Sequence, residues 1–288
     1  MSSSTGSTTR RPEVQRAAVI THGQAETVKE PLERLRALAQ ERSVELVLPE
    51  DEVAKHGDGA GAAGDVTSAD LAVVLGGDGT MLRALKTFLG TEVPVFGVNF
   101  GRVGFLASAR AEELEAGVGR AFAGDFEVVE LPALEASAGG GSWQAVNDVV
   151  VTSSTLGRMI ELGWAIGGED LGALPCDGLI CSTPSGSTAY NLSNGGPVLV
   201  WRLDAMALTF VAPHSLHARP LVVPRGRALT VTNRTTDVGA TVLVDGHAVH
   251  ELAPGDRVEA RLSEQRSLLA TLPEETFFTR YRRTFVAE

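Results

Sequence analysis

The hydrophobic positions divide the chain into two parts with different periodicity. In the first part, short apolar runs alternate with segments that carry apolar residues at helical spacing. The runs predict buried strands at residues 17–21, 44–48, 71–75 and 93–98, and the spaced segments predict helices that include residues 28–39, 81–89 and 111–123. We expect a mobile loop at residues 50–67, which are rich in Gly, Ala and Asp. The alternation predicts a parallel sheet in an α/β layer.

After about Leu131 the pattern changes to short β-rich runs separated by turn residues. These runs fall at residues 145–152, 161–166, 179–182, 207–211, 221–223, 228–232, 240–244, 257–261 and 267–271. A helical or irregular insert is expected at residues 183–196. The fold class is therefore α/β, with an N-terminal Rossmann-like parallel-sheet domain and a C-terminal β-rich, β-sandwich-like domain. The expected divisions are a disordered tail (1–12), the N-terminal domain (13–130), the β-rich domain (131–272) and a segment that packs back on the N-terminal domain (273–288).

Composition narrows the classes of function. The 288 residues carry a formal net charge of -11, from 36 acidic and 25 basic side chains. No long-range positive field is therefore available to collect nucleic acid or an anionic membrane. No apolar run reaches about 18 residues, so no transmembrane helix is expected. The absence of a secretory signal favours a cytoplasmic protein, and two cysteines argue against a disulfide scaffold.

The loop GGDGT, at residues 76–80, follows a buried strand and precedes a helix. Thr80 is a suitable N-cap residue for that helix. In an open parallel sheet, ligands bind at the carboxyl ends of the strands. Glycine backbone N–H groups can approach phosphates there, and a helix N-terminus favours negative charge. We therefore predict a phosphate-donor loop formed by Gly76, Gly77, Gly79 and Thr80.

Asp78 is the informative residue of this loop. A carboxylate about 4 Å from a phosphate charge is repelled by roughly 1 kcal/mol in water and by about 4 kcal/mol at an effective dielectric of 20. A loop built only to bind phosphate would not hold an Asp. The acid makes sense if it meets a hydroxyl nucleophile or Mg²⁺, since it can orient the hydroxyl and accept its proton during phosphoryl transfer. The alternative is a plain Gly-Asp-Gly turn.

Three further segments carry candidate ligand contacts. GVNFGRVGFL, at residues 97–106, offers a second glycine loop and Phe105, which either stacks on a flat ring or lies in the core. AVNDVVV, at residues 145–151, places a polar pair inside an apolar run, as a ligand contact or as a β-bulge. DGLICSTPSGSTAYNLSNGGP, at residues 177–197, holds many short donors and acceptors that can surround a polar ligand.

Together these four segments resemble the NAD kinase family, in particular its prokaryotic members that use ATP or polyphosphate. GGDGT is shared with diacylglycerol-type lipid kinases, whereas the segment at residues 177–197 is more particular to NAD kinases. PHSLHARP, at residues 213–220, is similar to a downstream family segment. The resemblance implies two domains with an active cleft between them. It also implies transfer of the γ-phosphoryl group of ATP to the 2′-hydroxyl of the adenosine ribose of NAD.

The resemblance also implies roles for individual residues. Asp78 matches the catalytic acid. The positions that match dinucleotide contacts are Asp78, Gly79, Phe105, Asn147, Asp148, Asp177, Thr188, Ala189, Tyr190 and Ser193, and Arg83 and Asp245 are further candidates. Mg²⁺ would be held through the nucleotide, with no protein ligand assigned. Family members assemble as homodimers or homotetramers, so the same is expected here.

The chain departs from the family pattern at three places. Asp148 stands where Glu is usual, which shortens the side chain by one methylene. Trp201 replaces an expected proline and Phe210 departs similarly, both with consequences for packing. Two alternatives stay open: a lipid or sugar kinase of the same superfamily, and a dinucleotide sensor without activity in which Asp148 marks decay of the site. The choice between ATP and polyphosphate as donor, and the role of Asp245, stay open as well.

Overall fold

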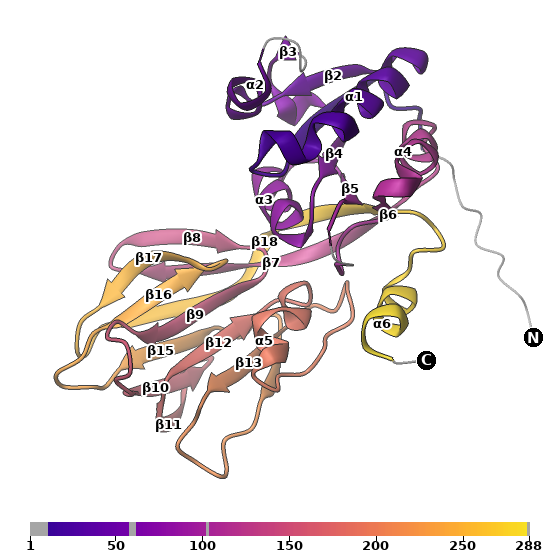
Figure 1. Ribbon diagram of the computed structural model, residues 1–288. Coiled ribbons are helices and arrows are strands. Elements are labelled where there is room, and N and C mark those ends of the chain that lie inside the picture. Colours follow the sequence, from indigo (N-terminus) through magenta and orange to yellow (C-terminus); the bar gives the residue numbers. More distant parts are fainter. Residues whose placement is uncertain (1–10, 58–61, 102–103, 287–288) are drawn as a thin grey trace, which may run out of the picture. The chain divides into compact units, whose positions relative to one another are not determined.

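The computed structural model describes residues 11–57, 62–101 and 104–286. The chain splits into two compact units, one formed by Met1–Val129 and Leu268–Glu288 and the other by Glu130–Ser267. Figure 1 labels the elements of both units. Of the predicted tail, residues 1–10 lie outside the described part, while the Arg11 N–H donates to the Gly124 carbonyl.

A parallel sheet forms the centre of the N-terminal unit. Its strands are β1 (Arg16–Thr21), β2 (Glu45–Leu48), β3 (Ala62–Ala63), β4 (Leu71–Leu75) and β5 (Val95–Asn99), with β6 (Ala109–Arg110) beside β5. The order is β5-β4-β1-β2-β3. Because β1 lies between β2 and β4, the strand order reverses at the carboxyl ends of β1 and β4. This reversal is the position at which doubly wound sheets bind ligands.

Helices pack on both faces of this sheet because its strands are apolar on both sides. Leu35 of α1 (Ala25–Glu41) and Val118 of α4 (Leu114–Phe122) share a core with Val19, Val73 and Phe96. The alternate positions of the strands face the other way, toward α3 (Asp78–Thr87). A Cβ added at Gly97 of β5 would lie 2.4 Å from Met81 Sδ of α3, so the helix and strand approach closely. The predicted α/β arrangement is confirmed.

The prediction of a mobile loop at residues 50–67 is wrong for the first part of that segment, where α2 (Glu50–His56) forms. A short 3-10 helix, η1 (Val66–Ser68), follows β3. Residues 58–61 lie outside the described part. Three acidic residues stand in the first turn of α2 and two basic residues in its last turn, which matches the helix dipole. The low apolar content hid this helix, since its one buried side chain is Glu52.

The predicted N-cap role of Thr80 is also wrong. The helix α3 begins at Asp78, Gly77 occupies the N-cap position, and Thr80 lies buried inside the first turn. A Cβ added at Gly76 would lie 2.4 Å from Thr80 Oγ1, so the strand end packs directly onto the threonine. The helix therefore starts three residues earlier than the capping signal indicated.

The second unit consists of two antiparallel groups of strands. The six-stranded sheet has the order β14-β13-β12-β9-β16-β17, with bounds Leu221–Pro224, Ala205–Val211, Gly178–Ser182, Asp148–Ser153, Ala240–Val244 and His247–Leu252. The second group contains β7 (Glu127–Ala138), β8 (Gly141–Ala145), β10 (Ile160–Ile166), β11 (Glu169–Cys176), β15 (Leu229–Asn233) and β18 (Arg257–Thr271). Residues of both groups share one core, which includes Leu134, Leu162, Val151 and Leu208. The predicted β-rich domain is confirmed.

Several strand boundaries differ from the pattern. The run 145–152 is broken at Val146 and Asn147, between β8 and β9, and the runs 257–261 and 267–271 belong to the single strand β18. Strands β7, β11 and β17 were not predicted. The side chains of β11 and β17 are largely exposed, so these two strands have no apolar pattern in the sequence. They form by backbone pairing with β10 and β16.

The insert at residues 183–196 contains η3 (Gly186–Thr188) and α5 (Tyr190–Ser193), in agreement with the helical alternative. Trp201 and Phe210, the two departures from the family pattern, are both buried. The Phe210 ring meets the Trp164 ring edge to face at 5.4 Å. Both departures are therefore accommodated in the core. The last helix, α6 (Phe277–Phe285), belongs to the N-terminal unit.

Candidate active site

A pocket of roughly 600 Å³ opens where the strand order reverses. Its described lining comes from the segments that follow β1, β4 and β5, namely His22, Gly23, Thr27, Gly77, Gly79, Thr80, Arg83, Phe100 and Gly101. This lining combines glycine backbone, the first turn of α3 and one guanidinium, and it includes no carboxylate. Such a lining suits an anion. Three of the four predicted phosphate-loop residues line the pocket, and Gly76 lies buried behind Thr80.

Asp78 starts α3, and its carboxylate accepts two backbone hydrogen bonds. The Phe105 N–H donates to Oδ2 at 2.7 Å, and the Leu106 N–H donates to Oδ1 at 3.2 Å. Gly104 allows this approach, because an added Cβ there would lie 2.1 Å from Asp78 Oδ1. The structure therefore joins the two predicted loops, GGDGT and the segment that ends at Leu106, through this one carboxylate.

Phe105 lies in the core, which is one of the two placements that the sequence left open. Its side chain is 6% exposed. The ring meets Phe277 at 5.2 Å, edge to face, and Phe285 at 5.9 Å, both from α6. Phe105 therefore anchors the segment that holds Asp78.

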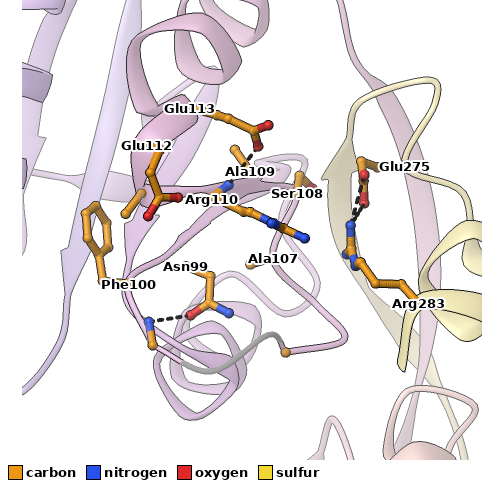
Figure 2. A pocket seen from close by; sticks show the side chains of 13 residues that line it. Asn99, Phe100, Ala107, Ser108, Ala109, Arg110, Glu112, Glu113, Glu275 and Arg283 are labelled. Atoms are coloured by element: carbon orange, nitrogen blue, oxygen red, sulfur yellow. Dashed lines mark hydrogen bonds and ion pairs between the residues drawn. The ribbon is translucent and has the colours of Figure 1, made fainter. Parts of the chain in front are cut away.

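A second pocket, of about 250 Å³, lies on the other side of residues 99–101. Figure 2 shows the Asn99 side chain accepting the Gly101 N–H at 2.9 Å, and the Glu275–Arg283 ion pair at 3.1 Å. Its lining mixes two arginines with three glutamates. This mixture gives no clear preference for an anion, so the glycine-lined pocket is the better phosphate site.

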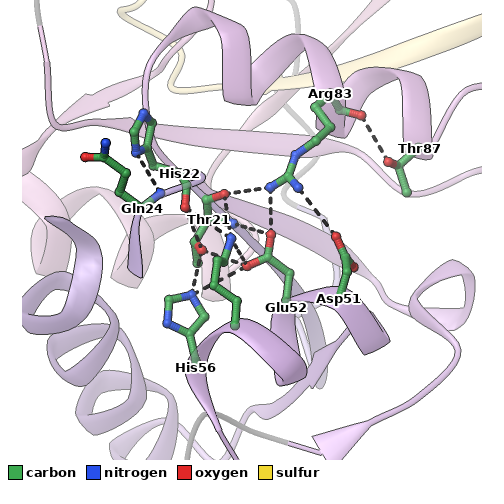
Figure 3. A network of polar contacts seen from close by, with 9 residues as sticks. Thr21, His22, Gln24, Asp51, Glu52, His56, Arg83 and Thr87 are labelled. Atoms are coloured by element: carbon green, nitrogen blue, oxygen red, sulfur yellow. Dashed lines mark hydrogen bonds and ion pairs between the residues drawn. The ribbon is translucent and has the colours of Figure 1, made fainter. Parts of the chain in front are cut away.

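A buried polar network that the sequence did not indicate supports Arg83. Glu52 of α2 is fully buried. Its carboxylate contacts Lys55 Nζ and an Arg83 guanidinium nitrogen, each at 2.6 Å, and accepts the Thr21 hydroxyl at 2.7 Å. The same Arg83 nitrogen donates to the Thr21 carbonyl at 2.6 Å (Figure 3). Arg83 is thereby fixed at the rim of the glycine-lined pocket.

The donors around Glu52 decide its ionisation. Burial by itself would raise the pKa of Glu52, but hydrogen bonds from Lys55 and Thr21 outweigh burial, and the pKa is lowered. His56, whose Nε2 lies 2.7 Å from the Thr21 hydroxyl, has its pKa lowered by burial and by the Lys55 charge. The network therefore holds an ionised glutamate and a neutral histidine at neutral pH.

In the second unit, Asp245 organises the polar pair of the AVNDVVV segment. Its carboxylate accepts the backbone N–H groups of Val146, Asn147 and Asp148 at 3.1, 2.8 and 3.4 Å. Asp245 has a positive φ of 49°, at the turn between β16 and β17. Asp245, Asn147 and Asp148 are thus brought together at the break between β8 and β9, which belong to different sheets.

The Asp148 side chain is 6% exposed. Burial, followed by the negative charge of Asp245, raises the pKa of Asp148 to about 7. A residue that the resemblance places at the dinucleotide is therefore partly protonated at neutral pH. The neighbouring Asn147 side chain faces Ser185, whose hydroxyl lies 3.3 Å from Oδ1.

The side chains of the hydroxyl-rich segment at residues 177–197 mostly form hydrogen bonds with backbone groups. Ser187 Oγ bridges the Pro184 carbonyl at 2.7 Å and the Leu199 N–H at 2.9 Å, and Thr183 Oγ1 donates to the Val146 carbonyl at 2.7 Å. Asn191 is buried and accepts the Thr209 hydroxyl at 2.7 Å. Of the predicted contacts in this segment, Ala189, Tyr190 and Ser193 are exposed, and Thr188 is partly buried.

Asp177 is separated from the Asn147–Asp148 pair. In the pairing of β12 with β9, Ser182 lies opposite Asp148, whereas Gly178 lies opposite Thr152. Asp177 precedes Gly178, so it lies at the far end of a five-residue strand, about 17 Å away at 3.3 Å per residue. The structure does not bring this exposed carboxylate to the same group.

Comparisons with known proteins assign the chain to a class. The ATP-NAD kinase N-terminal domain family matches residues 4–126, and the ATP-NAD kinase C-terminal domain family matches residues 146–272. An NAD kinase of Gemmatimonas aurantiaca is 40% identical over 222 residues, which cover 75% of this chain and 77% of that protein. The chain therefore belongs to the NAD kinase family, and the resemblance inferred from the sequence is confirmed.

Solved structures agree in fold. The yeast NADH kinase complexed with NADH has a TM-score of 0.81 at 22% identity, and the match covers 96% of this chain and 88% of that one. An NAD kinase from Archaeoglobus fulgidus in complex with ATP has a TM-score of 0.71 at 29% identity, covering 93% and 98%. Among the described residues, no helix is long and apolar enough to cross a membrane.

Proposed function

We propose that this protein transfers the γ-phosphoryl group of ATP to the 2′-hydroxyl of the adenosine ribose of NAD. The ribose oxygen bonds to the γ-phosphorus, the bond from that phosphorus to the β,γ-bridging oxygen breaks, ADP leaves, and the hydroxyl proton passes to Asp78. NADP is the product. The observation that carries the proposal is the Asp78 carboxylate, which two backbone N–H groups orient beside a glycine-lined pocket with Arg83 at its rim.

The donor would enter as its Mg²⁺ complex. In the described part of the chain, no group of three or more His, Cys, Asp or Glu side chains could hold a metal ion. Mg²⁺ keeps several waters and is usually bound through substrate phosphates and few protein ligands. The ion would neutralise phosphate charge, while Arg83 and the glycine backbone of the pocket bind phosphate oxygens.

The dinucleotide contacts stay proposals. Gly79 and Phe105 flank Asp78, and the other candidates are Asn147, Asp148, Asp177, Thr188, Ala189, Tyr190 and Ser193, with Asp245 supporting Asn147. A homodimer or homotetramer is proposed with them from the family resemblance, and a cytoplasmic location is proposed as well.

A coupled assay tests the reaction. Purified protein is mixed with NAD, ATP and Mg²⁺, and an NADP-specific dehydrogenase reports the product as NADPH. We expect turnover by the wild type, and a loss of about 10²-fold or more in Asp78→Asn with NAD binding retained. Unchanged turnover in Asp78→Asn would remove the role of this acid.

Parallel reactions separate the alternatives. Replacing ATP by polyphosphate identifies the donor, and adding lipid or sugar acceptors in place of NAD tests the related kinase activities. Binding of NAD without turnover by any donor would support the sensor alternative and would point to Asp148 as the lesion.

A further inference from the structure

The helix α6 carries a fully buried guanidinium. Arg280 is the largest side chain with no exposure in the described residues, and it lies on a helix whose other arginines, Arg282 and Arg283, are exposed. Burying a cation is costly unless hydrogen-bond acceptors surround it. The groups that accept hydrogen bonds from Arg280 therefore indicate which part of the structure the buried guanidinium stabilises.

Arg280 donates to a ring of neutral oxygens. The partners are the backbone carbonyls of Glu275 (3.1 Å), Phe105 (3.1 Å) and Ala107, and the hydroxyls of Ser108 (3.0 Å) and Thr271 (2.8 Å). Burial lowers the pKa of Arg280 to about 10, which still leaves it charged at neutral pH. Three of these acceptors belong to residues 105–108, and the first two residues of that segment hold the Asp78 carboxylate.

One peptide group connects the two side chains. The Phe105 carbonyl accepts from Arg280, and the Leu106 N–H, which is part of the same peptide group, donates to Asp78 Oδ1 at 3.2 Å. The cation at the carbonyl end polarises this group, and the polarisation strengthens hydrogen bonding at its N–H end. The arginine and the aspartate therefore act on opposite ends of one dipole.

The two hydrogen bonds from the backbone leave the Asp78 carboxylate able to accept a further one. An ionised Asp offers about four acceptor positions on its two oxygens. The Phe105 and Leu106 N–H groups take one on each oxygen, so each oxygen keeps a position for a hydroxyl. A fixed orientation of the reacting groups is a large part of catalysis, since a misplacement of about 1 Å can cost about 10²-fold in rate.

We propose that Arg280 is a positioning residue for Asp78, and that it acts through the Phe105–Leu106 peptide group to hold the carboxylate toward the hydroxyl acceptor. This proposal rests on the proposed function, in which Asp78 accepts the proton. The competing role is a purely structural one, in which Arg280 fastens α6 to residues 105–108 and has no particular effect on Asp78.

A double-mutant cycle distinguishes these roles. The variants are Arg280→Lys, which keeps the charge and loses the planar fork, Asp78→Asn, and the combination of both. Arg282→Lys is the matched control, because it makes the same change at an exposed arginine of the same helix. For each protein, kcat, KM for NAD, KM for ATP and the thermal midpoint are measured.

We expect Arg280→Lys to lower kcat by about tenfold while both KM values stay within about twofold, with no change in Arg282→Lys. In the Asp78→Asn background, Arg280→Lys should lower the residual kcat by less than about twofold, because the carboxylate that Arg280 positions is gone. An equal loss of kcat in both backgrounds, or a change confined to KM, would overturn the proposal.

Two further outcomes are informative. If Arg280→Lys does not fold, Ser108→Ala removes one acceptor of the guanidinium, and the same cycle should show a smaller loss of kcat that disappears in Asp78→Asn. If Asp78→Asn by itself retains wild-type turnover, the proposed function of Asp78 fails. Loss of turnover in Asp78→Asn together with additive variants contradicts the role of Arg280 alone.

Discussion

The two units of the chain hold a buried carboxylate in opposite ways. In the N-terminal unit, Glu52 contacts Lys55, Arg83 and Thr21, and its pKa is lowered although burial alone would raise it. In the second unit, Asp148 lies beside the like charge of Asp245, and its pKa is raised to about 7 by burial and by that charge.

The supply of donors explains this difference. The three backbone N–H groups at the break between β8 and β9 donate to Asp245 and not to Asp148. Glu52, by contrast, lies between a lysine, an arginine and a hydroxyl. Burial is nearly complete at both sites, so the identity of the neighbours determines whether the carboxylate is ionised.

The largest effect is expected from Glu52→Gln. This change leaves Lys55 and Arg83 without their buried counter-charge, and we expect a loss of about 3 to 5 kcal/mol in the free energy of unfolding at pH 7. Because the pKa of Glu52 is lowered in the folded state, its contribution is present above the unfolded pKa and is lost as the pH falls.

Urea unfolding at pH 7 and near pH 4 measures the Glu52 effect, and the difference from wild type should shrink in acid. Glu50→Gln, at an exposed position in the first turn of the same helix, is the control. An equal loss in both variants would mean that the buried network contributes nothing specific.

Asp148→Asn should change the free energy of unfolding in the opposite direction. The folded pKa of about 7 lies above the ordinary value, so the stability that Asp148 contributes by binding a proton is complete below the unfolded pKa, near pH 4, and is lost as the pH rises through about 7. The neutral amide avoids this loss, and we expect the variant to be about 2 to 3 kcal/mol more stable than wild type at pH 8, with no gain near pH 4.

Thermal or urea unfolding at the two pH values checks this, with the exposed Asp177→Asn as the control. A gain that does not depend on pH would contradict the buried, protonated state of Asp148.

Gly104→Ala adds a third carboxylate, that of Asp78, to the comparison. Two backbone N–H groups hold this carboxylate in a partly exposed position. The new methyl group would lie 2.1 Å from Oδ1 and must displace the carboxylate. We expect kcat to fall by about 30-fold with a smaller change in stability.

Steady-state kinetics measure this loss, and Gly119→Ala in α4 is the control because its added Cβ meets only ordinary contacts, at 3.7 Å and beyond. Wild-type kcat in Gly104→Ala would mean that the position of Asp78 is not critical.

Local patterns predicted a large part of this fold. The four main parallel strands follow from apolar runs that are buried on both faces, and the GGDGT loop was placed correctly because a strand, a loop and a helix are consecutive in the chain. The helix α2 was missed because its apolar pattern is weak and its buried residue is a glutamate. The core position of Phe105 needed α6, whose aromatic residues follow it by more than 170 positions.

The sequence by itself determined the α/β and β-rich halves, the NAD kinase resemblance and Asp78 as the candidate acid, because these depend on short-range periodicity and on residues that are neighbours in the chain. Only the tertiary structure decided which groups lie next to each carboxylate: Lys55 and Arg83 around Glu52, the like charge of Asp245 beside Asp148, and the Arg280-bound peptide against Asp78. Hydrogen bonds and charges act over a few ångströms in space, and folding brings together hydrogen-bonding residues that lie as far as 175 positions apart along the chain.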